Sequence, residues 1–315
     1  MSSEVPPPSS EPVDSEPPPG ADSPYVESPE PDLPPVPDDA DDTRGVHLRN
    51  LLRHPATLIG GLGTAAIALV AVGASAGFGI GAAVAGGILL LTLVIVWLIA
   101  NGRARDDFFN AYAQGRGLTR IDGKSNLPPI TPLLQKGDRR YAEQRFNGVL
   151  PGGLDGSLCL YTYEDTSTDS DGNRQTTYVH YTLAMTQLPQ TAALMQELFC
   201  QRRFGFRFMD SAEDVFRRRQ RVEHESEAVD KKFEIFIGAN DDMNRARQVL
   251  SPSFLVWLES HSPEAYAFEL VAGSLVCNVK GHKKSAAELD ILCTASAAVA
   301  RRLADEAAEM TAPTP

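Results

Sequence analysis

Charged residues and histidine are missing from one long stretch of the sequence, from Pro55 to Gly102. A single helix of these 48 residues would be about 72 Å long, because an α-helix rises about 1.5 Å per residue. The hydrocarbon core of a bilayer is only about 30 Å thick. One straight helix would therefore be too long. The sequence instead predicts a transmembrane hairpin over residues 57–102, with two helices at about 57–74 and 80–100. This pattern indicates an integral membrane protein.

Lysine and arginine are absent from residues 1–43, which hold 12 acidic residues and 13 of the 23 prolines. The net charge of the chain, −12, therefore comes from this tail, and the remainder is neutral overall. The tail has few apolar side chains to bury, so we expect a proline-rich, disordered region. A nearly neutral folded part without a recognised motif also argues against a nucleic-acid partner.

Cysteine is scarce, and its spacing excludes the usual redox and zinc motifs. Four cysteines lie far apart, with no C-x-x-C pair: Cys159, Cys200, Cys277 and Cys293. The acidic N-terminus also lacks the basic start of a cleavable secretory signal. We expect four reduced, buried thiols in a reducing compartment.

The charges that border the apolar stretch predict its orientation. Residues 44–56 form a basic collar before it, and Arg103 and Arg105 follow it, whereas the turn between the two spans carries no charge. Basic residues stay on the cytoplasmic side of a membrane. The pattern predicts a two-span protein of the cell membrane with both termini in the cytoplasm and the lipid bilayer as its partner.

Small residues repeat at a helical spacing within the apolar stretch, at Gly73, Gly77 and Gly81. Glycines four residues apart let two helix backbones approach closely. We expect them to pack the two spans together, and a homo-oligomer formed through the same face is the alternative. Gly73–Gly77 also matches the G-x-S-x-G motif of hydrolases, but a membrane helix lacks the required strand and turn, so no catalytic residue is assigned.

The remainder divides into a juxtamembrane helix with a proline-rich linker, 103–132, and a cytosolic α+β domain, 133–310. Apolar alternation and turn residues predict antiparallel strand pairs with inserted helices and a long C-terminal helix. The expected elements are hairpins at 157–163 with 175–185 and at 266–271 with 274–279, a strand at 204–209 and another at 233–237, and helices at 190–200, 241–250, 251–258 and 284–310. The element order resembles a pleckstrin-homology-type barrel of six or seven strands.

Three short motifs carry a resemblance to known sequences. They are Phe108-Phe-x-x-Tyr-Ala-x-x-Arg-Gly-Leu118, Val222-Glu-His-Glu-Ser226 leading to Phe233-Glu-Ile-Phe, and Leu250-Ser-Pro-Ser-Phe-Leu-x-Trp-Leu258. Over roughly residues 57–280 the chain resembles uncharacterised bacterial membrane proteins in which a transmembrane hairpin precedes a soluble domain of unknown function. The resemblance implies a membrane location and no catalytic residues.

Two polar clusters are candidates for chemistry. His224 lies among three glutamates, but a metal site there would need His180, His261 or His282, and no spacing suggests it. We therefore expect no metal and no cofactor. Arginines near an anionic membrane surface contribute about 1 kcal/mol each, which makes a dense arginine run the candidate membrane contact: Arg202, Arg203, Arg217, Arg218, Arg219 and Arg221.

The sequence therefore favours a membrane-anchored cytosolic module that binds a protein, the membrane surface or a small ligand without catalysis. One alternative is a membrane-tethered enzyme whose site lies around His180, His224 and the neighbouring glutamates. Another is an oligomeric membrane assembly held together by the glycine-rich helices.

Overall fold

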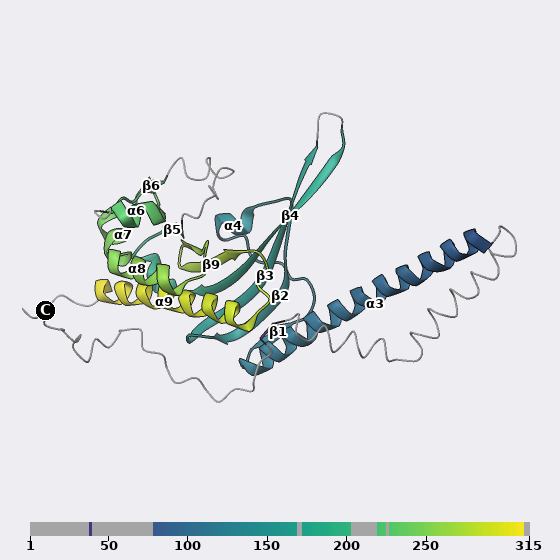
Figure 1. Cartoon of the computed structure of the whole chain (residues 1–315). Coiled ribbons are helices and arrows are strands. Elements are labelled where there is room, and N and C mark those ends of the chain that lie inside the picture. Colours follow the sequence, from purple (N-terminus) through teal and green to yellow (C-terminus); the bar gives the residue numbers. More distant parts are fainter. Residues whose placement is uncertain (1–37, 40–77, 169–171, 203–218, 225–226, 312–315) are drawn as a thin grey trace, which may run out of the picture.

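The computed structural model describes residues 38–39, 78–168, 172–202, 219–224 and 227–311 (Figure 1). Its helices are α3 (Phe78–Gly115), α4 (Pro132–Gln135), η1 (Pro189–Ala192), α6 (Glu227–Lys232), α7 (Met243–Val249), α8 (Pro252–His261) and α9 (Ala286–Thr311). Its strands are β1 (Thr119–Ile121), β2 (Arg139–Leu150), β3 (Leu154–Thr168), β4 (Arg174–Gln187), β5 (Glu197–Arg202), β6 (Gln220–Arg221), β7 (Phe233–Ile237), β8 (Ala267–Val271) and β9 (Ser274–Lys280).

The described strands form one antiparallel sheet in the order β1-β2-β3-β4-β9-β8-β5-β7-β6. The predicted α+β class with a long C-terminal helix is confirmed. The resemblance to a barrel of six or seven strands is wrong, because the sheet has nine described strands and two edges, β1 and β6, that pair with one neighbour each. The strands are joined mainly through neighbouring hairpins, as expected where turns are short.

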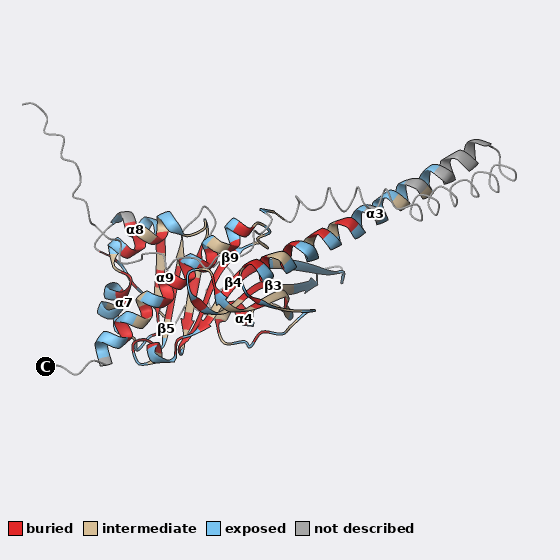
Figure 2. Ribbon diagram, turned by 90° about the horizontal axis from the view of Figure 1, so that it is seen from below, coloured by how far each residue is buried: buried red, intermediate tan, exposed pale blue. Residues whose placement is uncertain are grey.

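Both sheet faces are covered, and the main core lies under α9. The apolar stripe predicted for this helix is buried, and each of its residues keeps at most 1% of its area exposed: Leu289, Leu292, Ala295, Val299 and Leu303. Figure 2 shows α9 lying along the sheet, with buried segments along its length. A second, smaller core on the other face contains Leu133 and Leu134 of α4 packed against Tyr161 and Tyr181. The apolar stripe of α9 therefore packs against the domain's own sheet.

Local sequence signals explain several elements. Ser251 caps α8, its hydroxyl accepting a hydrogen bond from the Phe254 N–H, and Pro252 occupies the first turn, as both residues favour. The hairpin of β8 and β9 turns at Ala272 and Gly273, which have φ of 47° and 83°, the left-handed pair of a tight hairpin turn. Both predicted hairpins and the strand at 233–237 are confirmed.

One predicted helix, 190–200, is wrong. The structure has a single 3-10 turn, η1, followed by β5. Leu198 and Cys200 of β5 are buried between β7 and β8, and this two-sided pairing overrides a weak helical propensity. The predicted strand at 204–209 lies outside the described residues.

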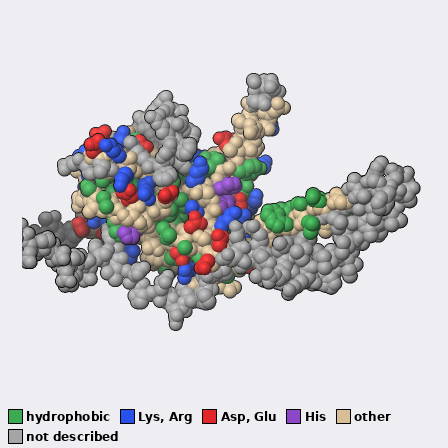
Figure 3. All heavy atoms as spheres, viewed as in Figure 1, with side chains coloured by type: hydrophobic (Ala, Val, Ile, Leu, Met, Phe, Trp, Pro, Cys, Tyr) green, Lys and Arg blue, Asp and Glu red, His purple; other side chains and the backbone are tan. Residues whose placement is uncertain are grey.

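Helix α3 is continuous, but its earlier part lies outside the domain and its later part packs in the domain core. Residues 86–99 of the helix expose large apolar side chains, including Leu90 at 67% and Leu98 at 55% of their area, and Figure 3 shows an apolar surface on the helix outside the domain. One face of residues 100–115 is buried in the main core, with Phe108, Phe109 and Tyr112 all at 0% exposed. The segment predicted as a juxtamembrane helix therefore contributes to the core of the folded domain.

Only one helix of the described residues is long and apolar enough to cross a membrane, Gly86–Gly115 within α3. The second predicted span falls in α3, whose start at Phe78 also takes in part of the predicted turn. The first predicted span lies outside the described residues, so the two-helix hairpin is not shown. From Phe78 to Ile99 the helix measures about 33 Å at about 1.5 Å per residue, close to the bilayer core.

Candidate histidine–glutamate site

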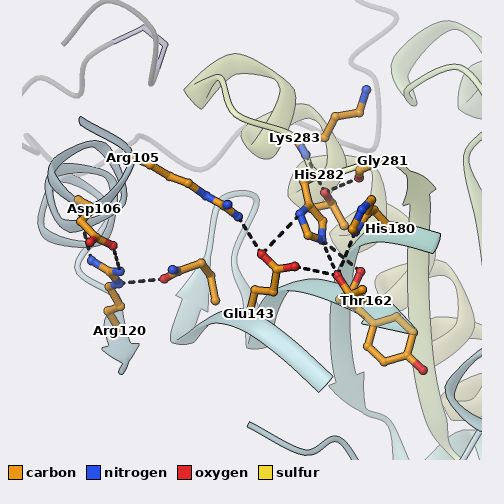
Figure 4. Close-up of polar contacts among 12 residues, drawn as sticks. Arg105, Asp106, Arg120, Glu143, Thr162, His180, Gly281, His282 and Lys283 are labelled. Carbon is orange, nitrogen blue, oxygen red and sulfur yellow. Dashed lines mark hydrogen bonds and ion pairs between the residues drawn. The ribbon is translucent and has the colours of Figure 1, made fainter. Parts of the chain in front are cut away.

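One group of potential ligands comes together in the described part of the chain: Glu143, His180 and His282. We call it the His–Glu cluster. One ligand atom of each residue lies within 4.8 Å of one from each of the others. Figure 4 shows the three side chains converging from β2, β4 and the turn after β9 on the hydroxyl of Thr162.

A β-bulge brings Glu143 into the cluster. Ala142 pairs with Tyr161 and Gln144 with Leu160, so Glu143 is an extra residue in β2. The bulge also switches the side-chain phase, because Ala142 packs in the smaller core whereas Phe146 packs in the main core. Bulges re-aim side chains in this way, and here the carboxylate reaches Thr162 on the neighbouring strand.

Thr162 organises the hydrogen bonds of the cluster. Its fully buried side chain donates to Glu143 Oε1 at 2.9 Å, which uses the single hydroxyl proton. The hydroxyl oxygen therefore accepts from His180 Nδ1 at 2.9 Å and from His282 Nε2 at 3.2 Å. His282 Nε2 also lies 3.1 Å from the carbonyl oxygen of Tyr161, an acceptor that requires a proton on this nitrogen.

This arrangement leaves two acceptors facing one another. With the proton on Nε2, the lone pair of His282 Nδ1 faces Glu143 Oε2 at 3.9 Å. Burial lowers the pKa of His282 despite the nearby Glu143 carboxylate. Burial disfavours the ionised form of Glu143, but the Thr162 hydrogen bond, His282 when it is protonated, and the Arg105 guanidinium together lower the pKa of this carboxyl overall. An anion and a lone pair thus meet where a cation would be stabilised.

Helix α3 supplies the positive charge nearest to the cluster. Arg105 Nη2 donates to Glu143 Oε2 at 3.1 Å. Arg120 of β1 fixes this part of the helix, since it bonds the Asp106 carboxylate at 2.7 Å and Gln144 at 2.9 Å (Figure 4). The His–Glu cluster is therefore in direct contact with the helix that carries the exposed apolar surface.

The cluster is suited to binding a cation or a proton. The Thr162 hydroxyl is fully buried and cannot reach a substrate as a nucleophile. His180 is exposed, whereas the side chains of Glu143 and His282 keep 24% and 10% of their area exposed, so solvent reaches the cluster from the side of His180. Two imidazoles and one carboxylate form a donor set that suits divalent transition metals.

The sequence prediction around His224 differs from this arrangement. His224 is buried, its backbone N–H donates to Asp230 at 3.0 Å, and no other histidine hydrogen-bonds to it among the described residues. Burial lowers its pKa. The enzyme alternative places a site around His180 and His224, whereas in the structure the histidine next to His180 is His282.

Three of the six arginines in the predicted membrane contact are described. Arg219 binds both carboxylate oxygens of Glu197 at 2.8 Å and lies over the Phe199 ring, and Arg202 lies 3.9 Å from Glu259. Arg221 is exposed. Arg221 lies on β6, which is the sheet edge opposite β1 and the neighbouring α3. Arg203, Arg217 and Arg218 lie outside the described residues, as do Gly73 and Gly77, and membrane contact by this run stays a prediction.

Sequence reasoning missed the His–Glu cluster because its members lie at positions 143, 180 and 282. The one available signal was the strand pairing of 157–163 with 175–185, which sets Thr162 opposite His180. Neither the bulge nor the return of β9 beside β4 follows from local sequence.

No family model, curated protein or solved structure matches the chain.

Proposed function

We propose that the chain is a membrane-anchored cytosolic module that binds a protein partner, the membrane surface or a small ligand, and that it acts as a scaffold or sensor without catalysis. The observation that carries this proposal is the continuity of α3. The apolar part of the helix, residues 78–99, is long enough for one crossing and exposes large apolar side chains within residues 86–99, and it continues without a break into residues 100–115, one face of which is buried in the domain. A rigid connection of this kind would hold the domain at the membrane in a fixed position.

A contact between the N-terminal tail and the domain supports the predicted topology. Asp39 forms an isolated antiparallel bridge with Ser285, and the Ala286 N–H donates to the Asp38 carbonyl at 3.1 Å. Residues 38–39 thus lie at the first turn of α9, where acidic side chains are favoured by the helix dipole. If α3 crosses the bilayer, the chain between 40 and 77 must cross it once more to return to this side. Two spans with both termini in the cytoplasm satisfy that requirement.

The proposed binding role is tested by crosslinking the full-length chain in its membrane and purifying it in mild detergent, alongside a chain that lacks residues 1–43. A binding module should retain a defined set of partners, and loss of a partner on deletion would assign it to the tail. A purified chain that retains no partner but turns over a substrate, and stops when one cluster residue is changed, would contradict the proposal.

A further inference from the structure

We propose that the His–Glu cluster is a binding site for a divalent transition metal ion of the Zn²⁺ class, with His282, His180 and Glu143 as ligands. The inference goes beyond the proposed function and does not depend on the membrane location. It rests on the donor set, on the tautomer that the hydrogen bonds impose, and on the position of the neighbouring cation.

The hydrogen bonds of His282 match those of a metal ligand. A ligating imidazole usually donates its second N–H to a backbone carbonyl or carboxylate, which fixes the tautomer and the ring orientation. His282 Nε2 lies 3.1 Å from the Tyr161 carbonyl oxygen, which leaves Nδ1 as the ligating atom. His180 is held in the same manner, because its Nδ1 donates to Thr162 at 2.9 Å and its Nε2 keeps a lone pair.

The spacing of the ligands is close to that of a bound ion. Metal–ligand distances of about 2.0–2.2 Å in a tetrahedral site place two ligand atoms about 3.4 Å apart. One ring nitrogen of each histidine and one oxygen of Glu143 lie within 4.8 Å of one another, and His282 Nδ1 and Glu143 Oε2 are 3.9 Å apart. A side-chain rotation that moves His282 Nδ1 or Glu143 Oε2 by about 1 Å would bring this pair to ligand spacing, and rotation of the exposed His180 ring would bring its Nε2 to the ion. The fourth position would face solvent beside the exposed His180.

Arg105 is the competitor of the ion. Its guanidinium donates to Glu143 Oε2 at 3.1 Å, the oxygen that faces His282 Nδ1. A bound divalent ion would repel this guanidinium and take over its oxygen. Metal binding would therefore release a contact between the sheet and α3, and this exchange is the physical link between the site and the helix proposed to enter the membrane.

The test uses the full-length chain without an affinity tag, purified in detergent and freed of metal by dialysis against a chelator. Zn²⁺ is titrated by calorimetry, and Co²⁺ is added as a spectroscopic probe. We expect about one high-affinity ion per chain and the intense visible absorption of four- or five-coordinate Co²⁺. His282→Gln, His180→Gln and Glu143→Gln should each abolish the high-affinity site.

Matched controls separate this site from other histidines. His261→Gln changes an exposed histidine that stacks on Trp257, and the double variant His47→Gln/His54→Gln changes the two histidines before the apolar stretch. All should keep the site. Arg105→Gln should bind Zn²⁺ more tightly, by on the order of tenfold, because it removes a competing charge.

Three results would overturn the proposal: no stoichiometric binding by the wild-type chain, binding that survives all three ligand substitutions, or loss of binding in the control variants alone. Thermal unfolding followed by circular dichroism identifies any variant that fails to fold. The Co²⁺ spectrum of the wild-type chain decides the matter without any variant, since the weak absorption of a six-coordinate ion would contradict the assigned site.

Discussion

A fragment that begins at Leu133 is expected to be unfolded, whereas one that begins at Ala100 should fold cooperatively. The shorter fragment lacks β1 and the second half of α3, including Phe108, Phe109 and Tyr112, which are fully buried in the main core. Removing one buried aromatic side chain costs about 3–5 kcal/mol. Three such losses approach or exceed the whole stability of a typical domain, about 5–15 kcal/mol.

The two fragments are compared by far-ultraviolet circular dichroism, thermal melting and gel filtration. Both fragments lack most of the exposed apolar surface of α3. A difference in solubility should therefore not account for a difference in folding between them. A cooperative melt of the fragment 133–315 with the native sheet signal would show that α3 is an appendage and would contradict this account.

Phe109→Ala should destabilise the domain by about 3–5 kcal/mol in urea unfolding of the fragment 100–315. The ring centroid of Phe109 lies 5.1 Å from that of Phe108 and 5.7 Å from that of Phe146 on β2. The substitution therefore leaves a cavity where α3 meets the sheet, and neighbours held in two elements cannot collapse to fill it.

Tyr178→Ala is the matched control, because this aromatic side chain is 54% exposed near the tip of the β3–β4 ribbon. It should change stability by no more than about 0.5 kcal/mol. Equal effects of the two substitutions would mean that the packing between α3 and β2 does not stabilise the domain.

The contact between α3 and the domain extends beyond aromatic packing. The Tyr112 hydroxyl donates to Asp290 of α9 at 2.9 Å, and Arg116 forms an ion pair with the same carboxylate. At its other side the helix is held by Arg120 and by the Arg105–Glu143 contact. A displacement of α3 along its axis would therefore disturb both α9 and the His–Glu cluster.

Much of the fold follows from local sequence patterns. The stripe of α9, the cap of α8 and the turn at Gly273 are each encoded within a few residues, and the structure has all three. The error at 190–200 arose where long-range pairing decides the conformation. Leu198 and Cys200 are strand residues because β7 and β8 flank them, and no local signal reports those neighbours.

The candidate site depended almost wholly on long-range structure. Glu143 joins the histidines only because an extra residue in β2 shifts its phase, and His282 only because β9 returns beside β4. Position 224, which has the densest titratable sequence around it, is buried elsewhere. Density of charged residues along the chain is thus a weak guide to a site that three separate strands and turns assemble.

The central claim, a two-span anchor with the tail and the domain on the same cytoplasmic side, is tested most directly by substituted-cysteine labelling in intact cells. The native thiols give little background, since all four cysteines are reduced and buried and burial raises the pKa of Cys159 to about 12. Single cysteines are placed at Ser23 in the tail, Ser75 in the predicted turn and Thr177 on an exposed strand of the domain. A membrane-impermeant maleimide should label the Ser75→Cys chain in intact cells, and the Ser23→Cys and Thr177→Cys chains only after the membrane is permeabilised. Labelling of Ser23→Cys without Thr177→Cys in intact cells would establish a single crossing and contradict the account.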